Sequence, residues 1–251
     1  MLVEAHVLRY GDDWLVPYVV RHYLSYADKL VIHDAGGGAS LEGFAERDKR
    51  VCVLPWDCHE VSDMRYAELR NSCWKGTKAD WVVVADMDEF IWFPEGAEKS
   101  LGAYTQMGAA SIRPHGFEMF SETYPTTQGQ IYDEIKFGAP DDKWYAKPIL
   151  FRPTLVSDMR WGLGSHECDP VLHDGRRFHV GPRWPFAKPP CYLLHFHHIG
   201  PAKDIGDKYD ATITRMCAQN KKMHWGNLEP GIKHVADKRA NIVPNLRQLI
   251  P

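Results

Sequence analysis

The sequence predicts an α/β fold with a mainly parallel central sheet flanked by helices and a helical C-terminal tail. Over the first ninety residues, apolar runs of strand length alternate with segments of helical periodicity, which is typical of βαβ units with right-handed crossovers. The strand runs are continuously apolar, as expected for strands buried on both faces of a parallel sheet. With 251 residues, 44% of them hydrophobic, the chain can bury the core of one large domain.

The predicted elements of the first half follow one another in a regular order. A strand at residues 2–8 precedes a helix at residues 14–26, which Asp12 or Asp13 can cap and in which Pro17 fits the first turn. The other elements of this half are strands at 29–33, 51–54 and 81–85 and a helix at 63–75.

The second half is more irregular. Residues 121–148 are polar and rich in turn residues, a texture typical of functional or mobile loops. Strands are predicted at 147–153 and 191–199, and residues 202–251 begin as a helix.

Charge and hydropathy exclude some classes of protein. The net charge is -3, from 30 basic and 33 acidic residues mixed along the chain, so no nucleic-acid footprint is present. No apolar run is long enough to span a bilayer, and Met1 leads directly into a strand-like segment with no room for a signal peptide. A cytoplasmic location is expected, with peripheral contact of the basic tail with an anionic membrane as an alternative. Six cysteines without a C-x-x-C pair favour reduced thiols.

Three acids follow the buried strand at 81–85. Ligands of parallel sheets gather at the carboxyl ends of strands, where Asp86, Asp88 and Glu89 lie. If the chain stays extended, Asp86 and Asp88 project to one side, a spacing suited to Mg²⁺ or Mn²⁺, while Glu89 points away and is structural. Strand-terminal acids often cap a following helix, but residues 91–94 (Ile-Trp-Phe-Pro) do not favour one.

A second acid, Asp34, lies at the end of the strand at 29–33 and precedes Gly36–Gly38. The glycines let the backbone approach a ligand closely, or form only a flexible loop, and they do not match the G-x-G-x-x-G turn of a Rossmann site. Parallel strands bring Asp34 and Asp86 to the same edge. A nucleotide there can have its base or ribose held by Asp34 and its phosphates held through a metal.

Histidines supply further candidate ligands. On a strand, His195 and His197 share one face, so one of them can bind the same cation as the aspartates. Histidines and carboxylates can also form a zinc hydrolase site, although no H-E-x-x-H helix is present. Earlier in the chain, glycines surround His166-Glu167, which indicates either backbone laid against a ligand or a surface turn.

These segments together resemble the family 2-like glycosyltransferases of the GT-A fold, from the first strand to about Lys208. The most specific segment is the D-x-D-E-F sequence at residues 86–90. The other matching segments are residues 14–23, 31–36, 79–85, 164–167 and 194–197, with Arg65, Arg70 and Asn71.

The resemblance implies a hexosyl- or deoxyhexosyltransferase that uses a UDP-, GDP- or dTDP-sugar with Mn²⁺ or Mg²⁺ and a carbohydrate acceptor, as in polysaccharide biosynthesis. On the donor side, Asp34 corresponds to the acid near the base, and Arg65 and Arg70 to residues near the nucleotide. Asp86 corresponds to a residue that contacts ribose or shares the metal. The family's loop after the second strand carries Gly-Ser and a second acid, which this chain lacks, so the donor is not implied.

The resemblance also assigns the metal and the acceptor side. Asp88 corresponds to the main metal ligand, and His195 or His197 to a late ligand. His166 and Glu167 face the acceptor, and Glu167 is the preferred general base. Its rivals are Asp141, Asp142 and Asp169.

The domain organisation follows from the same resemblance. Residues 1–201 form the GT-A-like domain, with a nucleotide-sugar-binding half at 1–95 and an acceptor-binding half at 96–201, and residues 202–251 form the tail. Two alternatives stay open. One is a phosphohydrolase or nucleotidyltransferase that uses the same acids. The other is a non-catalytic carbohydrate-binding module, which the 9 tryptophans and 11 tyrosines would suit.

Overall fold

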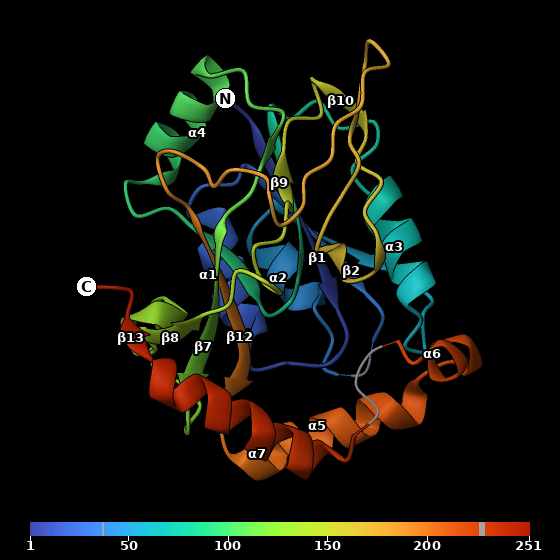
Figure 1. Ribbon diagram of the computed structural model, residues 1–251, viewed down its shortest axis with the longest axis vertical. Coiled ribbons are helices and arrows are strands. Elements are labelled where there is room, and N and C mark those ends of the chain that lie inside the picture. Colours follow the sequence, from blue (N-terminus) through green and yellow to red (C-terminus); the bar gives the residue numbers. More distant parts are fainter. Residues whose placement is uncertain (37, 226–228) are drawn as a thin grey trace.

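The computed structural model describes residues 1–36, 38–225 and 229–251 (Figure 1), so Gly37 of the glycine loop and residues 226–228 of the tail lie outside the described residues. A six-stranded sheet has the order β3-β2-β1-β4-β9-β6. Four of its strands are parallel: β1 (Val3–Arg9), β2 (Lys29–Asp34), β3 (Val51–Pro55) and β4 (Trp81–Asp86). The last two, β9 (Leu150–Phe151) and β6 (Ser111–Ile112), join it by antiparallel pairing.

A second sheet has the order β13-β8-β7-β12-β5. In this sheet β12 (Tyr192–Ile199) is parallel to the central strand β7 (His115–Ser121) and antiparallel to the edge strand β5 (Glu89–Trp92). Its far edge consists of β8 (Phe137–Pro140) and β13 (Arg247–Gln248). Only Met87 and Asp88 separate β4 from β5, so the acidic segment is the turn that connects the two sheets. A short hairpin-like pair, β10 (Val156–Asp158) and β11 (Val171–Leu172), lies apart from both sheets.

Helices cover both faces of the six-stranded sheet. Apolar side chains of α1 (Val16–Leu24) pack with Ala5 and Val7 of β1, whereas Trp74, just beyond α3 (Asp63–Ser72), packs with Val82 and Val84 of β4. The other helices of this part are α2 (Glu42–Arg47) and α4 (Ala97–Gln106). These features confirm the predicted α/β fold with a mainly parallel central sheet.

The C-terminal tail is helical, as predicted. It contains α5 (Ala202–Arg215), α6 (Ala218–Met223) and α7 (Gly231–Ile242), and α5 and α7 lie across the end of the molecule toward which β12 runs (Figure 1). In the parts of the chain that the structure describes, no helix is long and apolar enough to cross a bilayer. The division into halves at residues 95 and 201 stays a prediction.

The expected capping of the first helix is wrong. The N-terminal capping position of α1 is Leu15, without a side-chain hydrogen bond, while Pro17 does lie in the first turn. Asp12 instead has a φ of 53° and its carboxylate accepts a hydrogen bond from Lys208 at 2.7 Å. The long-range ion pair prevails over the local cap.

His22 lies on the buried face of α1. Its ring packs against Phe90 with centroids 4.8 Å apart and against Tyr26 at 5.5 Å, and the side chain is almost inaccessible to solvent. Burial lowers the pKa of His22 to about 3, from an ordinary value of 6.5.

This burial predicts a specific acid sensitivity. Between pH 6.5 and about 3 the unfolded chain binds a proton that folded His22 does not, so stability falls as the pH falls through this window. In His22→Leu, the loss of unfolding free energy between pH 7 and pH 5 should be smaller by about 2 kcal/mol in total, because the unfolded imidazole is only partly protonated near pH 6.5. Urea unfolding at pH 7, 6 and 5 measures this slope. The exposed His59, changed to Leu, is the control and should keep the wild-type slope. Equal slopes for His22→Leu and the wild type would contradict the prediction.

Candidate functional site

The turn between the two sheets positions Asp88. Met87 points into the core, and the backbone carbonyl of Asp88 accepts a hydrogen bond from the Phe196 amide at 2.7 Å. Because β12 also pairs with β5, with His195 opposite Glu89, the Asp88 side chain lies beside the histidines of β12.

Asp88, His195 and His197 form one group, which we call the Asp88 trio. Nδ1 of His197 lies 2.8 Å from Oδ2 of Asp88, and Nε2 of His195 lies 3.6 Å from the same oxygen. The two imidazole rings are nearly parallel, at 5° with centroids 5.5 Å apart, as expected for alternate residues of a strand. One donor atom from each of the three residues lies within 4.8 Å of the others.

The trio suits a divalent cation. A carboxylate and two imidazoles are ligands that Mn²⁺, Zn²⁺ and related ions accept. The outer nitrogen of His195, Nδ1, lies 3.0 Å from both carboxylate oxygens of Glu118, an arrangement that leaves Nε2 of a neutral ring free to bind a metal. Among the residues that the structure describes, none forms a hydrogen bond with the buried Nε2 of His197. The geometry of the residues therefore fits a cation.

Three basic side chains surround the Asp88 carboxylate. Burial opposes its ionisation, but His195, His197 and Lys208 together hold its pKa well below the usual range. Burial also opposes protonation of His195, yet the carboxylates of Glu118 and Asp88 raise its pKa. Burial and the nearby Lys208 lower the pKa of His197. Asp88 is therefore a carboxylate at neutral pH and ready to act as a metal ligand.

A cavity of about 500 Å³ opens in front of the trio, at the carboxyl ends of β1 and β4. Its charged and histidine lining consists of Arg9, Asp12, Asp63, Arg70, Asp86, Asp88, His195, His197, Lys208 and Arg215. A second cavity, of about 470 Å³, shares His197 and Lys208 with the first. The volume is in the range of small-ligand sites.

The two aspartates of the acidic segment face different partners. Asp86 ends β4 and its Oδ1 accepts a hydrogen bond from Arg70 at 2.5 Å, and it lies outside the trio. The chain turns at Asp88 and is not extended there, so the two carboxylates do not project side by side. Glu89 is buried, 2.5 Å from Lys147, and accepts a hydrogen bond from the Asp86 amide at 3.0 Å. These contacts agree with a structural role for Glu89.

Two predicted nucleotide contacts lie away from the cavity lining. Asp34 Oδ1 accepts hydrogen bonds from Arg9 at 2.7 Å and from the Gly36 amide at 2.9 Å. Arg65 is exposed, and its guanidinium bonds to the Asp57 carbonyl. The structure thus brings Arg70 and Asp86 together with the trio, but not Asp34 or Arg65.

The predicted acceptor-side residues lie near the surface. The Glu167 side chain is 59% exposed, with His179 3.8 Å away, and it does not line the cavity, although Gly164 does. His166 Nδ1 lies 2.8 Å from the Trp144 carbonyl, and burial together with the nearby Lys147 lowers the pKa of His166 to about 4.

The three rival bases differ in their surroundings. Asp169 is exposed and lies 2.8 Å from His179. Asp142 accepts a hydrogen bond from the Gly116 amide at 2.8 Å. Asp141 lines a further cavity of about 390 Å³ beside Trp144, and burial raises the pKa of Asp141. Of the three, Asp141 has the surroundings best suited to accept a proton.

Sequence reasoning missed three residues of the site. Lys208 lies 4.0 Å from Asp88, Glu118 holds His195, and the Tyr145 ring stacks on His195 with centroids 4.1 Å apart. None of them belongs to a local motif. One feature of the sequence could have pointed to Lys208: it is a cationic residue in an amphipathic helix that directly follows the strand with the histidines.

Comparisons with known proteins give distant likenesses. No family model and no curated protein matches the chain. Among solved structures, S. aureus TarS in complex with UDP is 12% identical over 61% of this chain and 47% of that chain, with a TM-score of 0.36. Another structure of S. aureus TarS is 11% identical over 96% and 43%, with a TM-score of 0.40. UDP-glucose pyrophosphorylase complexed with UDP-glucose is 9% identical over 78% and 75%, with a TM-score of 0.31. This chain therefore spans about half the length of the TarS chains in the first two matches.

The geometry predicts that the two aspartates contribute unequally to metal binding. Asp88→Asn keeps the shape of the side chain but removes the charged ligand, so Mn²⁺ affinity should fall at least roughly 100-fold, more than loss of an outer-shell partner causes. Asp86→Asn, two residues away and paired with Arg70, is the matched control and should change the affinity by less than about tenfold. Isothermal titration calorimetry measures both. A larger loss in Asp86→Asn than in Asp88→Asn would show that the trio is not the metal site.

Proposed function

We propose that this protein is a metal-dependent, inverting glycosyltransferase that moves a sugar from a nucleotide-sugar donor to a hydroxyl of a glycan or glycoconjugate. The observation that carries the proposal is the Asp88 trio, which faces a cavity of about 500 Å³ at the carboxyl end of β4. Its acid comes from the D-x-D-E-F segment, the most specific point of resemblance to the GT-A glycosyltransferases.

The charges of the cavity suit a nucleoside diphosphate. Arg70, Lys208 and Arg215 line it, and such cations bind phosphate oxygens. Tyr10 and Tyr66 line the same cavity and offer aromatic faces to a base or a sugar ring. A bound divalent cation would supply neutralisation of the charge that develops on the departing diphosphate.

The acceptor side needs a carboxylate that takes the proton of the attacking hydroxyl. Glu167 is the proposed base and Asp141 its main rival. Glu167 follows the glycine segment that reaches the cavity at Gly164, whereas Asp141 lies in the neighbouring cavity beside the exposed ring of Trp144, a surface on which a sugar can stack. In this proposal residues 1–95 bind the donor and residues 96–201 the acceptor.

Paired substitutions separate the two bases. Glu167→Gln should lower kcat by about 10²-fold to 10⁴-fold with little change in donor KM, because a general base contributes on that scale. Asp141→Asn should then lower kcat less than tenfold. Steady-state transfer assays with both variants decide between them, and the reverse order of effects would assign the base to Asp141.

Transfer itself is tested with purified protein and a panel of UDP-, GDP- and dTDP-sugars in Mn²⁺, with glycan acceptors. We expect one donor to yield a glycosylated acceptor by mass spectrometry, with an inverted anomeric configuration by NMR. Asp88→Asn should abolish the product while circular dichroism shows an unchanged fold. Full transfer by that variant would overturn the proposed mechanism.

A metal-dependent hydrolase is the second candidate. The observation that favours it is the presence of two imidazoles in the trio, since zinc hydrolases commonly combine two histidines with one carboxylate. The same assay distinguishes the two reactions. Release of free sugar or phosphate without a glycosylated acceptor, at every acceptor concentration, would favour the hydrolase.

A further inference from the structure

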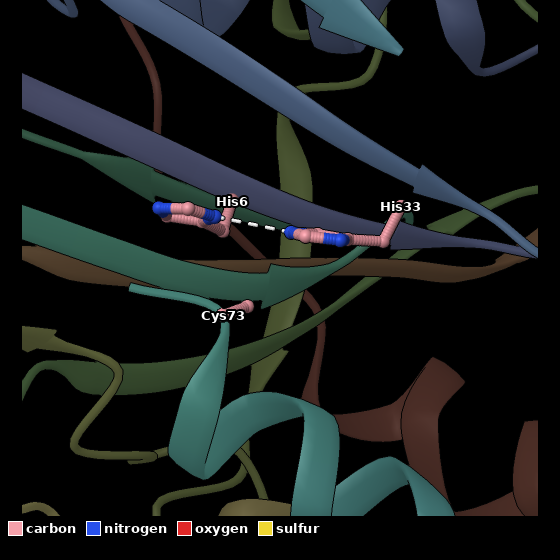
Figure 2. Close-up of side chains that lie close together, drawn as sticks. All are labelled: His6, His33 and Cys73. Carbon is pink, nitrogen blue, oxygen red and sulfur yellow. Dashed lines mark hydrogen bonds between the residues drawn. The ribbon is translucent and has the colours of Figure 1, made fainter. Parts of the chain in front are cut away.

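A second group of metal-binding side chains lies on the face of the six-stranded sheet that α3 covers. His6 of β1 and His33 of β2 point along this face, and Cys73 follows the end of α3 beside them (Figure 2). Both histidines are buried, and one donor atom from each of the three residues lies within 4.8 Å of the others. The cavity at this group shares no lining residue with the cavity in front of the Asp88 trio.

One ring nitrogen of His6 faces one ring nitrogen of His33. Nδ1 of His6 lies 3.1 Å from Nε2 of His33. The opposite nitrogen of His6, Nε2, lies 3.2 Å from Oε1 of Glu4. Glu4 is itself fixed by the Thr77 hydroxyl at 2.6 Å and by Lys29 at 3.1 Å. Among the described residues, Nε2 of His6 is buried without a hydrogen-bond partner, so Glu4 is a nearby carboxylate in the position where a metal ligand usually has its outer-shell partner.

We propose that His6, His33 and Cys73 bind one zinc ion through Nδ1, Nε2 and Sγ. Two nitrogens on a tetrahedral zinc lie about 3.4 Å apart, given Zn–N distances near 2.1 Å, so the observed 3.1 Å needs only a small separation of the rings. As the ion binds, the proton between the two rings moves to the far nitrogen of the ring that carried it, so that each neutral ring presents a lone pair, and the Cys73 thiol releases its proton to solvent. Two imidazoles and one thiolate favour zinc over Mg²⁺ or Mn²⁺.

A cavity beside the three side chains gives a zinc ion a route in and leaves room for a fourth ligand. A cavity of about 420 Å³ is lined by Glu4, His6, Thr77 and Cys73, which gives room for a water or a small anion at the open position. Cys52 of β3 lines the same cavity but lies outside the ligand group.

The role of this ion is structural. It links the end of α3 to the neighbouring strands β1 and β2. Arg70, which holds Asp86, lies one helical turn before Cys73 in the chain, so the ion also fixes the helix that positions this arginine. The inference does not depend on the proposed transferase activity.

Cobalt substitution tests the site in reducing buffer, in an Asp88→Asn background that removes the trio as a competing site. One equivalent of Co²⁺ should produce a thiolate-to-cobalt charge-transfer band in the near ultraviolet, which the trio cannot give because it contains no sulfur. Cys73→Ser and His33→Gln should each lose at least about 90% of this band. The matched control Cys52→Ser should retain it, and competition with Zn²⁺ should remove it.

Thermal unfolding gives an independent readout. Zn²⁺ should raise the Tm of the Asp88→Asn protein and of its Cys52→Ser variant by at least about 4 °C, and leave the Cys73→Ser variant unchanged. Absence of the cobalt band in the folded protein would overturn the proposal. So would a band that persists in Cys73→Ser or that disappears only in Cys52→Ser.

Discussion

The buried carboxylate of Asp88 joins the two sheets and the C-terminal helices at one point. Removing an ion from water costs several kcal/mol unless partners compensate, and here three cationic or cation-forming groups surround one oxygen: His195 and His197 of β12 and Lys208 of α5. Because Asp88 lies in the two-residue turn between the sheets, satisfying this charge holds both sheets and the C-terminal helices at one point. The tail is therefore part of the site, since it supplies Lys208.

Three acids within four residues would repel one another if they shared one environment. The structure gives each a cation from a different element: Arg70 of α3 for Asp86, Lys147 for Glu89, and the histidines with Lys208 for Asp88. The separation lets the segment carry three negative charges in a partly buried place. The two aspartates therefore have different roles. Asp88 can bind a cation, and Asp86 orients Arg70 toward the same cavity.

The sequence could predict the features that depend on local pattern. Continuous apolar runs defined the parallel strands, and the period of two placed His195 and His197 on one face, because both are set by neighbouring residues. The relative orientation of the Asp86 and Asp88 side chains could not be predicted, because the local sequence is compatible with both an extended chain and a turn at Asp88. The part of Lys208 and Glu118 in the site could not be predicted for a different reason. They meet the histidine strand and its aspartate only through tertiary packing, and no short motif records that contact. Asp12 shows the same limit, because its distant partner Lys208 prevailed over the local helix cap.

Each of the two histidine groups has a carboxylate near the far nitrogen of a strand histidine. Glu118 is hydrogen-bonded to His195, whereas Glu4 lies 3.2 Å from Nε2 of His6 without hydrogen-bond geometry. Their other donors differ. The trio adds a carboxylate oxygen and lies at a charged cavity of about 500 Å³, whereas the second group adds a thiol and lies beside a different cavity, of about 420 Å³. Because oxygen donors favour harder cations and sulfur donors softer ones, the chemistry of the ligands would keep an exchangeable catalytic cation and a fixed structural one in separate places.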